Sequence, residues 1–430
     1  MANVKVNTSA SVELKIDGVD LGHLISHFEW ESEINGGYTV RCKVQDAHHV
    51  NLKAIAKGDG AAVEYLENGK IRPIQVTWKM IWNDELQTVE RTGYLTDLWG
   101  TGSGNKSVLE FVAIDPPSFV LNIGVASGGY YKGSVSQVIK QIIEEANDSL
   151  DDGFRITHKV SNTKDSVDNI WWPMRMDPFT HIMSMLEWSA AVGAKNSQSR
   201  WIVSSVDKSI NIQFEDDLQQ KAYGPKDGSG KQQPAVYVIN PNDRTAIDSS
   251  KWRLQMDSFI SVYQSNIVTS GISATSGLYI DPVNNKKNSV INDANTGGKI
   301  NVKLESDRAF SKSNKKWATW VGSTPEHSGG EVGVPYQDYA KGRAQQSYIN
   351  VLSNSMRMLV TVHGEYRLHD SSILGQAVCA LQFIDLDNEE YFLHGPWIID
   401  GFKHTYSNRK SWRTELELYR LDYNANAKKI

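Results

Sequence analysis

The sequence predicts a mostly β protein of the α+β class, in which two similar small β-barrels flank an α/β domain and long polar loops are inserted. Three observations support this prediction: alternating polar and apolar stretches near both ends, helix-type patterns in the middle, and a strand order that occurs twice. The expected organisation is a first barrel over 1–120, an α/β domain over 121–216, a linker over 217–250, and a second barrel over 251–430 with a polar insertion at about 284–335.

The first barrel is predicted from short strands separated by turns. Val12–Ile16 alternates with period two and is followed by an Asp17-Gly18 turn. Further strands are expected at Tyr38–Val44, Val76–Trp82, Leu86–Leu98 and Ser107–Ile114. Several short strands with turns between them are typical of a small barrel or sandwich.

Two helices and a hairpin are predicted in the middle segment. Ser134 and Gln137 form a capping-box pattern ahead of apolar residues at helical spacing. A second helix is expected to begin with Pro178 at its first position and to end at Gly193. Trp201–Phe214 has the pattern of a β-hairpin, so this segment suits helices packed on strands.

The rest of the chain alternates between polar stretches and regular elements. Residues 217–234 and 284–330 are polar and predict loops, which at that length are usually functional or disordered. A third helix is expected over Tyr336–Leu352, and strands from Met356 to the end.

One strand pattern occurs twice. The first copy, from Val76 to Ile114, contains a strand, an acidic turn, a strand with a glycine and a closing strand. The second, from Ala380 to Leu421, has the same order. Three copies of a chain with two similar barrels would present six similar faces, which can match a six-fold tube.

Four segments carry a resemblance to a known family. They are Gly93–Asp97 with Leu109–Phe119, then Tyr131–Ile139, then Met174–Phe179, then Gly395–Arg420, which includes Trp397, His404 and Thr414–Leu418. In their order and spacing the chain resembles phage baseplate hub proteins, late control protein D and the N-terminal region of type VI secretion spike proteins.

The resemblance implies a virion structural protein of a contractile-tail baseplate, assembled in the host cytoplasm. It implies a hollow homotrimer whose partners are the tail tube protein, baseplate wedge proteins, a tape measure protein and a spike. The chain ends about ten residues after the last expected strand, so the spike is expected to be a separate protein.

Composition restricts the partners. With 45 Lys and Arg against 50 Asp and Glu, the net charge of -5 is too mild to indicate nucleic acid or an anionic membrane as the main partner. DNA is expected only in transit through the lumen. No signal peptide or membrane anchor is expected, and Cys42 and Cys379 suit free thiols in a reducing cytosol.

The sequence predicts no catalytic, cofactor-binding or metal-binding residues, and hence no enzyme. His48-His49 is the only adjacent histidine pair, and neighbours on a strand point to opposite faces. Glu144-Glu145 and Asp151-Asp152 suit solvated charge better than a glycosidase pair.

Aromatic residues are the candidate interface residues. Large aromatic side chains dominate protein interfaces but also fill cores. The candidates for contact with a partner are Trp171, Trp172, Trp317, Trp320 and Trp397.

Two other functions stay open. A distal-tail or tube-initiator ring protein would have a similar order of elements, and oligomeric state would separate the two, since a hub is a trimer and a distal ring a hexamer. A cell-wall polysaccharide hydrolase or lectin would need clustered carboxylates and exposed aromatic residues in one cleft.

Overall fold

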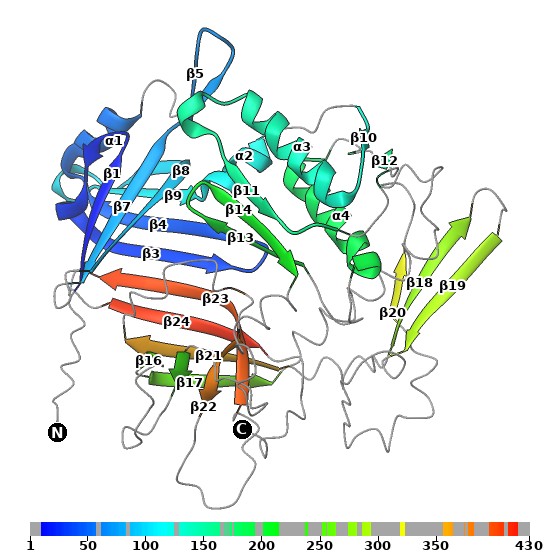
Figure 1. The fold of residues 1–430 in the computed structure, drawn as a ribbon. Coiled ribbons are helices and arrows are strands. Elements are labelled where there is room, and N and C mark those ends of the chain that lie inside the picture. The colour runs from blue at the N-terminus through cyan, green and yellow to red at the C-terminus, as the bar shows by residue number, and fades with distance from the viewer. Residues whose placement is uncertain are drawn as a thin grey trace, which may run out of the picture.

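The computed structural model is mostly β-sheet, with a helical unit beside the largest sheet (Figure 1). It describes residues 10–56, 62–82, 87–123, 129–163, 167, 170–171, 173, 176–193, 201–214, 237–239, 252–254, 256–263, 274–281, 286–293, 319–322, 356–363, 374, 377–381, 395–407 and 412–419. The predicted mostly β, α+β class is confirmed.

The N-terminal part supplies most of one sheet. Its elements are β1 (Ala10–Ile16), β2 (Val19–Asp20), η1 (Gly22–Leu24), β3 (Ile25–Glu33), β4 (Gly37–Gln45), η2 (Ala47–His49), α1 (Val50–Ile55), β5 (Val63–Tyr65), β6 (Ile71–Pro73), β7 (Gln75–Trp82), β8 (Gln87–Thr101), η3 (Gly104–Lys106) and β9 (Val108–Ile114). The five predicted strands are present, because an alternating stretch can bury one face of a sheet and expose the other.

The C-terminal part completes the same sheet. Its strands are β15 (Tyr237–Ile239), β16 (Trp252–Leu254), β17 (Met256–Tyr263), β21 (Met356–His363), β22 (Ala377–Leu381), β23 (Gly395–Ser407) and β24 (Trp412–Tyr419). The described strands form a 14-stranded sheet whose main run is β17-β21-β24-β23-β3-β4-β9-β8-β7-β1-β2, and β22, β15 and β16 extend from β23. In Figure 1 the strands β3, β23, β24, β21 and β17 lie side by side.

One hydrophobic core lies against this sheet and joins both ends of the chain. Trp30, Tyr38 and Trp78 pack edge to face near its centre, with ring centroids 5.8–6.3 Å apart. Phe402 packs on Trp30 from the C-terminal part, at 5.9 Å. Such aromatic contacts add stability beyond the area they bury, so this core holds the N-terminal and C-terminal parts of the sheet together.

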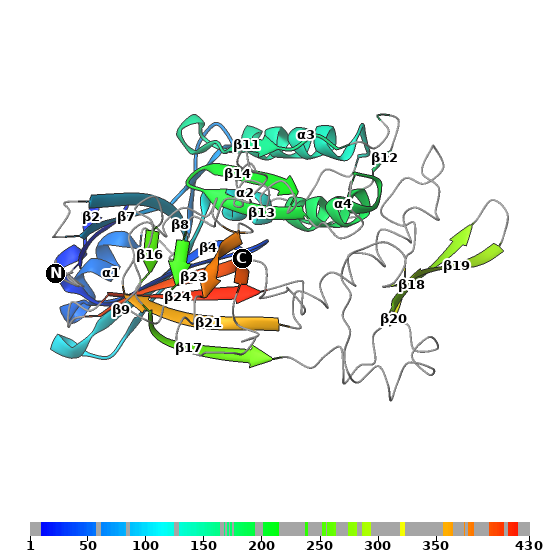
Figure 2. The same cartoon turned by 60° about the horizontal axis from the view of Figure 1, so that its bottom comes forward.

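The middle of the chain builds a second core from helices and a small sheet. The elements are α2 (Pro116–Ile123), β10 (Tyr131–Lys132), α3 (Val135–Asp148), η4 (Asp152–Phe154), β11 (Thr157–Val160), β12 (Ile170–Trp171), α4 (Pro178–Gly193), β13 (Trp201–Val206) and β14 (Ser209–Phe214). Figure 2 shows α3 and α4 gathered over β11, β13 and β14. The capping box of Ser134 and Gln137 is present at the start of α3, and Pro178 begins α4 as predicted.

A three-stranded sheet corrects one prediction. It contains β18 (Ala274–Asp281), β19 (Lys286–Asp293) and β20 (Thr319–Gly322). The prediction of a loop over 284–330 is therefore wrong for β19 and β20. Backbone pairing gives these strands their hydrogen bonds, which a polar sequence with little alternation does not reveal.

Other predictions lie outside the described residues or stay predictions. The loop at 217–234 and the helix over Tyr336–Leu352 lie outside the described residues. Among the described strands the large sheet does not close on itself, so the two small barrels stay a prediction. The domain boundaries at 120, 216 and 250 also stay predictions.

Candidate functional site

The large sheet contains two five-stranded units with the same strand order. The N-terminal unit runs β3-β4-β9-β8-β7, and the C-terminal unit runs β17-β21-β24-β23-β22, with antiparallel pairing at every step. In each unit a pair of strands comes first in sequence and a three-stranded meander follows. The pattern that the sequence shows twice is therefore confirmed as a repeated topology, and the repeat extends to the two strands before each meander.

The two units also share a β-bulge at the same place. In the N-terminal unit, Thr96 is skipped where β8 pairs with β9, one residue after the Leu95–Ala113 pair. In the C-terminal unit, Asp400 is skipped where β23 pairs with β24, one residue after the Ile399–Leu418 pair. A bulge is a specific local feature that increases strand twist, so a matched bulge aligns the two units residue by residue.

The units meet in a seam between β23 and β3. Gly401–Ser407 of β23 pairs antiparallel with His27–Glu33 of β3. An ion pair between Lys403 Nζ and Glu29 Oε2, at 3.1 Å, spans the seam on the exposed side. On the buried side, His404 of β23 lies 5.2 Å from the Trp30 ring and its Nδ1 is 2.8 Å from Thr414 Oγ1. The chain thus joins two like units into one continuous sheet.

The face of the sheet opposite the core is polar and carries many charges, and we call it the polar face. On the part of this face formed by β3, β4, β9, β21, β23, β24 and the C-terminal half of β8, acidic side chains outnumber basic ones: Glu29, Glu31, Glu33, Asp97, Glu110, Asp400, Glu415 and Glu417 against Arg41, Lys43, Arg357, Lys403 and Arg413. Ion pairs link neighbouring strands across this face, such as Lys43 with Glu110 at 2.9 Å. Such exposed ion pairs each add little to the stability of the fold.

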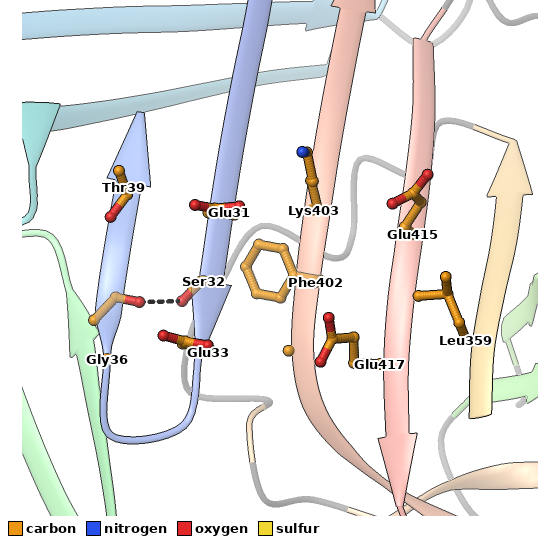
Figure 3. A pocket seen from close by; sticks show the side chains of 12 residues that line it. Glu31, Ser32, Glu33, Gly36, Thr39, Leu359, Phe402, Lys403, Glu415 and Glu417 are labelled. Atoms are coloured by element: carbon orange, nitrogen blue, oxygen red, sulfur yellow. Dashed lines mark hydrogen bonds between the residues drawn. The ribbon is translucent and has the colours of Figure 1, made fainter. Parts of the chain in front are cut away.

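A shallow hollow lies in the polar face where the two units meet. Figure 3 shows Lys403 on the strand between those that carry Glu31 and Glu415, with Glu33 and Glu417 beside them. Desolvation, together with the charges of Glu417, Glu31 and Asp400, raises the pKa of Glu33. Burial also opposes ionisation of Glu29, but hydrogen bonds from His27 and Lys403 outweigh it and lower the pKa of Glu29. The hollow therefore holds more negative charge than its basic groups offset.

A buried joint, made by hydrogen bonds around Asp115 and Asn35, fixes the helical unit to the large sheet at the turn between β3 and β4. Asp115 is fully buried and accepts hydrogen bonds from the backbone N–H groups of Tyr38, at 3.0 Å, and Ser118, at 2.9 Å. Burial raises the pKa of Asp115 even though these bonds favour the carboxylate. Beside it, Asn35 and Val203 exchange two hydrogen bonds of 2.9 Å, so the β3–β4 turn docks on β13.

The candidate interface tryptophans fall into two groups. Trp171 is 1% exposed and donates from Nε1 to the Gly133 carbonyl at 3.0 Å, and Trp397 is 0% exposed. Both side chains lie in cores of this chain and present no surface to a partner. Trp172, Trp317 and the side chain of Trp320 lie outside the described residues, and their interface role stays a prediction.

One exposed tryptophan of the described chain was not among the predicted candidates. Trp99 of β8 is 41% exposed and lies at the edge of the polar face. The aligned bulges place Trp99 at the position of Lys403, three residues after the skipped residue in each unit.

The other candidate groups show no metal site. His48 and His49 lie in the turn η2 and not on a strand. In the part of the chain that the structure describes, no cluster of three or more His, Cys, Asp or Glu residues could hold a metal ion. Nor does any described helix have the length and apolar character needed to span a membrane.

Solved structures with the same fold include two tail proteins. A tail protein from Neisseria meningitidis MC58 is 11% identical over 96% of this chain and 97% of its own, with a TM-score of 0.56. The 43 kDa tail protein of prophage MuSo2 from Shewanella oneidensis is also 11% identical with a TM-score of 0.56, over 96% of this chain and 99% of its own. At this identity the likeness establishes a shared fold. No family model and no curated protein sequence matches the chain.

Proposed function

We propose that the chain is a structural subunit of a phage contractile tail, namely the central hub of the baseplate. It acts as a hollow homotrimer between the six-fold tail tube and the three-fold spike. The observation that carries this proposal is the pair of like five-stranded units joined in one sheet. The shared fold with two tail proteins over almost the full length of each supports a role in a tail.

The repeat explains how three chains could meet a six-fold partner. Each chain presents two similar units, so a ring of three chains presents six similar surfaces to the tube protein. The opposite end of the ring retains three-fold symmetry and suits a separate spike protein, while wedge proteins surround it. The rigid aromatic core suits a part that must transmit force without bending.

The polar face suits the wall of the lumen. Its acidic excess would repel phosphate groups, whereas clustered Lys and Arg would bind them and hold DNA in place. DNA and the tape measure protein would then pass through the lumen in transit. Trp172, Trp317 and Trp320 remain candidate contacts with the partners.

The test is the oligomeric state of the purified chain with its symmetry. Native mass spectrometry and electron microscopy are expected to show a closed trimer with a central opening and six similar lobes at one end. A monomer at high concentration would overturn the hub assignment. A closed hexamer would favour a distal-tail or tube-initiator ring instead.

A further inference from the structure

The C-terminal half of β8 pairs with a described strand on one edge only, whereas the matching half of β23 is paired on both edges. One edge of β8 pairs with β7 only over Gln87–Tyr94, and the opposite edge pairs with β9 over Tyr94–Thr101. Among the described strands, none pairs with the β7-side edge over Asp97–Thr101. In the other unit the matching residues of β23 continue past β22 and pair with β3. Within the described part of the chain the seam between β23 and β3 is therefore formed, whereas no described strand forms the equivalent seam on β8.

The repeat identifies which strand would fill the open edge. β3 fills the existing seam, and the register of the two units matches β3 with β17: Phe28 opposite Cys42 corresponds to Phe259 opposite Val360. Among the described strands β17 pairs only with β21, so none of them occupies its outer edge. β17 belongs to the far end of the same sheet, and six strands lie between it and β8. Joining the two edges within one chain would require the sheet to close on itself, which the described strands do not do, so we take the strand from a second copy.

We propose that β17 of one copy pairs antiparallel with Asp97–Thr101 of β8 in the next copy, and that this seam closes the trimer. The inference rests on the proposed function and specifies the contact between its subunits. The occupant of the edge is another copy of this chain, because its own β17 is the counterpart of the strand that fills the same position in the other unit.

The existing seam gives the register of the new one. Lys403 lies opposite Glu31, and Thr405 opposite Glu29. Aligning the two units at their matched bulges places Trp99 at the position of Lys403 and Val262 at the position of Glu31. It likewise places Thr101 at the position of Thr405 and Ile260 at that of Glu29. We therefore expect Trp99 opposite Val262, and Thr101 opposite Ile260, of the next copy.

The residue types at these positions suit a strand pair between chains. Aromatic and β-branched residues favour cross-strand pairs in sheets. Trp99 is 41% exposed in the single chain and would be covered by the incoming strand. An unpaired edge of this kind otherwise invites uncontrolled association, which a closed ring prevents.

The test is disulfide cross-linking at the expected register. Cysteines directly opposite each other on antiparallel strands are close enough to form a disulfide. In a Cys42→Ala, Cys379→Ala background, Thr101→Cys with Ile260→Cys is expected to give covalent species of two and three chains, and no more, after mild oxidation. Thr101→Cys with Val262→Cys, two residues out of register, is expected to cross-link at least ten-fold less.

The chain offers a matched control. Thr405→Cys with Glu29→Cys occupies the same positions in the existing seam, so it should form a disulfide within one chain and leave a single-chain band. A trimer by native mass that gives no more cross-linking at 101 and 260 than the out-of-register pair would overturn this seam and leave the hub assignment intact. A ladder that continues beyond three chains would also overturn it, and a monomer would overturn the hub assignment itself.

Discussion

Replacing Gly37 with alanine should destabilise the joint between the sheet and the helical unit. The loss should exceed that of the same replacement at an ordinary turn glycine. Gly37 has a φ of +69°, and a methyl group there would clash with Asp115 Oδ2 and Ser118 Oγ. The left-handed backbone costs an alanine about 1 kcal/mol. Displacing the carboxylate oxygen also breaks its bond from the Tyr38 N–H, and a hydrogen bond to a charged group contributes about 1.5–3 kcal/mol. The expected loss is therefore about 2.5–4 kcal/mol.

Urea unfolding followed by tryptophan fluorescence measures this loss. Gly18→Ala is the control, because Gly18 has a φ of +85° and nothing lies within 4 Å of an added methyl group, so only about 1 kcal/mol should be lost. Equal losses for the two variants would refute the reasoning. Combining Gly37→Ala with Asp115→Ala should cost less than the sum of the single changes, since the methyl group then meets no carboxylate.

Two further changes examine the same joint and the hollow. Asn35→Ala should cost about 1–2 kcal/mol, because it leaves the buried Val203 N–H without its acceptor, and hydrogen exchange should rise at Val203 first; unchanged protection there would contradict the docking described. Glu33→Gln should raise the thermal midpoint slightly at pH 7 and leave it unchanged near pH 4. A carboxyl with a raised pKa favours the folded state when protonated and loses that contribution as pH rises, so removing its charge helps only where wild-type Glu33 is ionised. A gain that persists at low pH would show that its cause is not charge.

The sequence predicted the parts of the fold that depend on local pattern. Alternation located β1, β4, β7, β8 and β9, and the capping box at Ser134 located the start of α3, whereas β3 was not predicted. Helix α2 was missed because Pro116-Pro117 suggests a break, although proline is well tolerated in the first turn of a helix that Asp115 caps. Burial of Trp171 and Trp397 could not be distinguished from exposure, because composition does not say which side of a strand is covered.

Less of the candidate site than of the fold could be predicted from the sequence. The repeat was visible only in its meander, where glycines and acidic turns recur. The seam joins β3 to β23, which lie more than 360 residues apart, and strand partners at that separation are decided by the whole sheet. The local sequences of β3 and β23 do not indicate which strand pairs with each of their edges.

The two seams need not be built alike, and their residues differ accordingly. Lys403 and Glu31 lie opposite each other in the seam within the chain, which covalent continuity already holds together, so exposed charges suffice there. A seam between separate chains must supply association free energy, and its counterpart of Lys403 is Trp99. Burying the exposed part of that side chain contributes on the order of 2 kcal/mol per seam.

Trp99→Lys, which gives the open edge the residue found at the existing seam, should therefore weaken the trimer by about ten-fold or more per seam while leaving the fold intact. Trp99→Phe keeps an apolar ring and should retain most of the affinity. Sedimentation over a dilution series, with circular dichroism to check folding, compares the three proteins. If Trp99→Lys assembled as tightly as the unaltered chain, the open edge would not be where the copies meet.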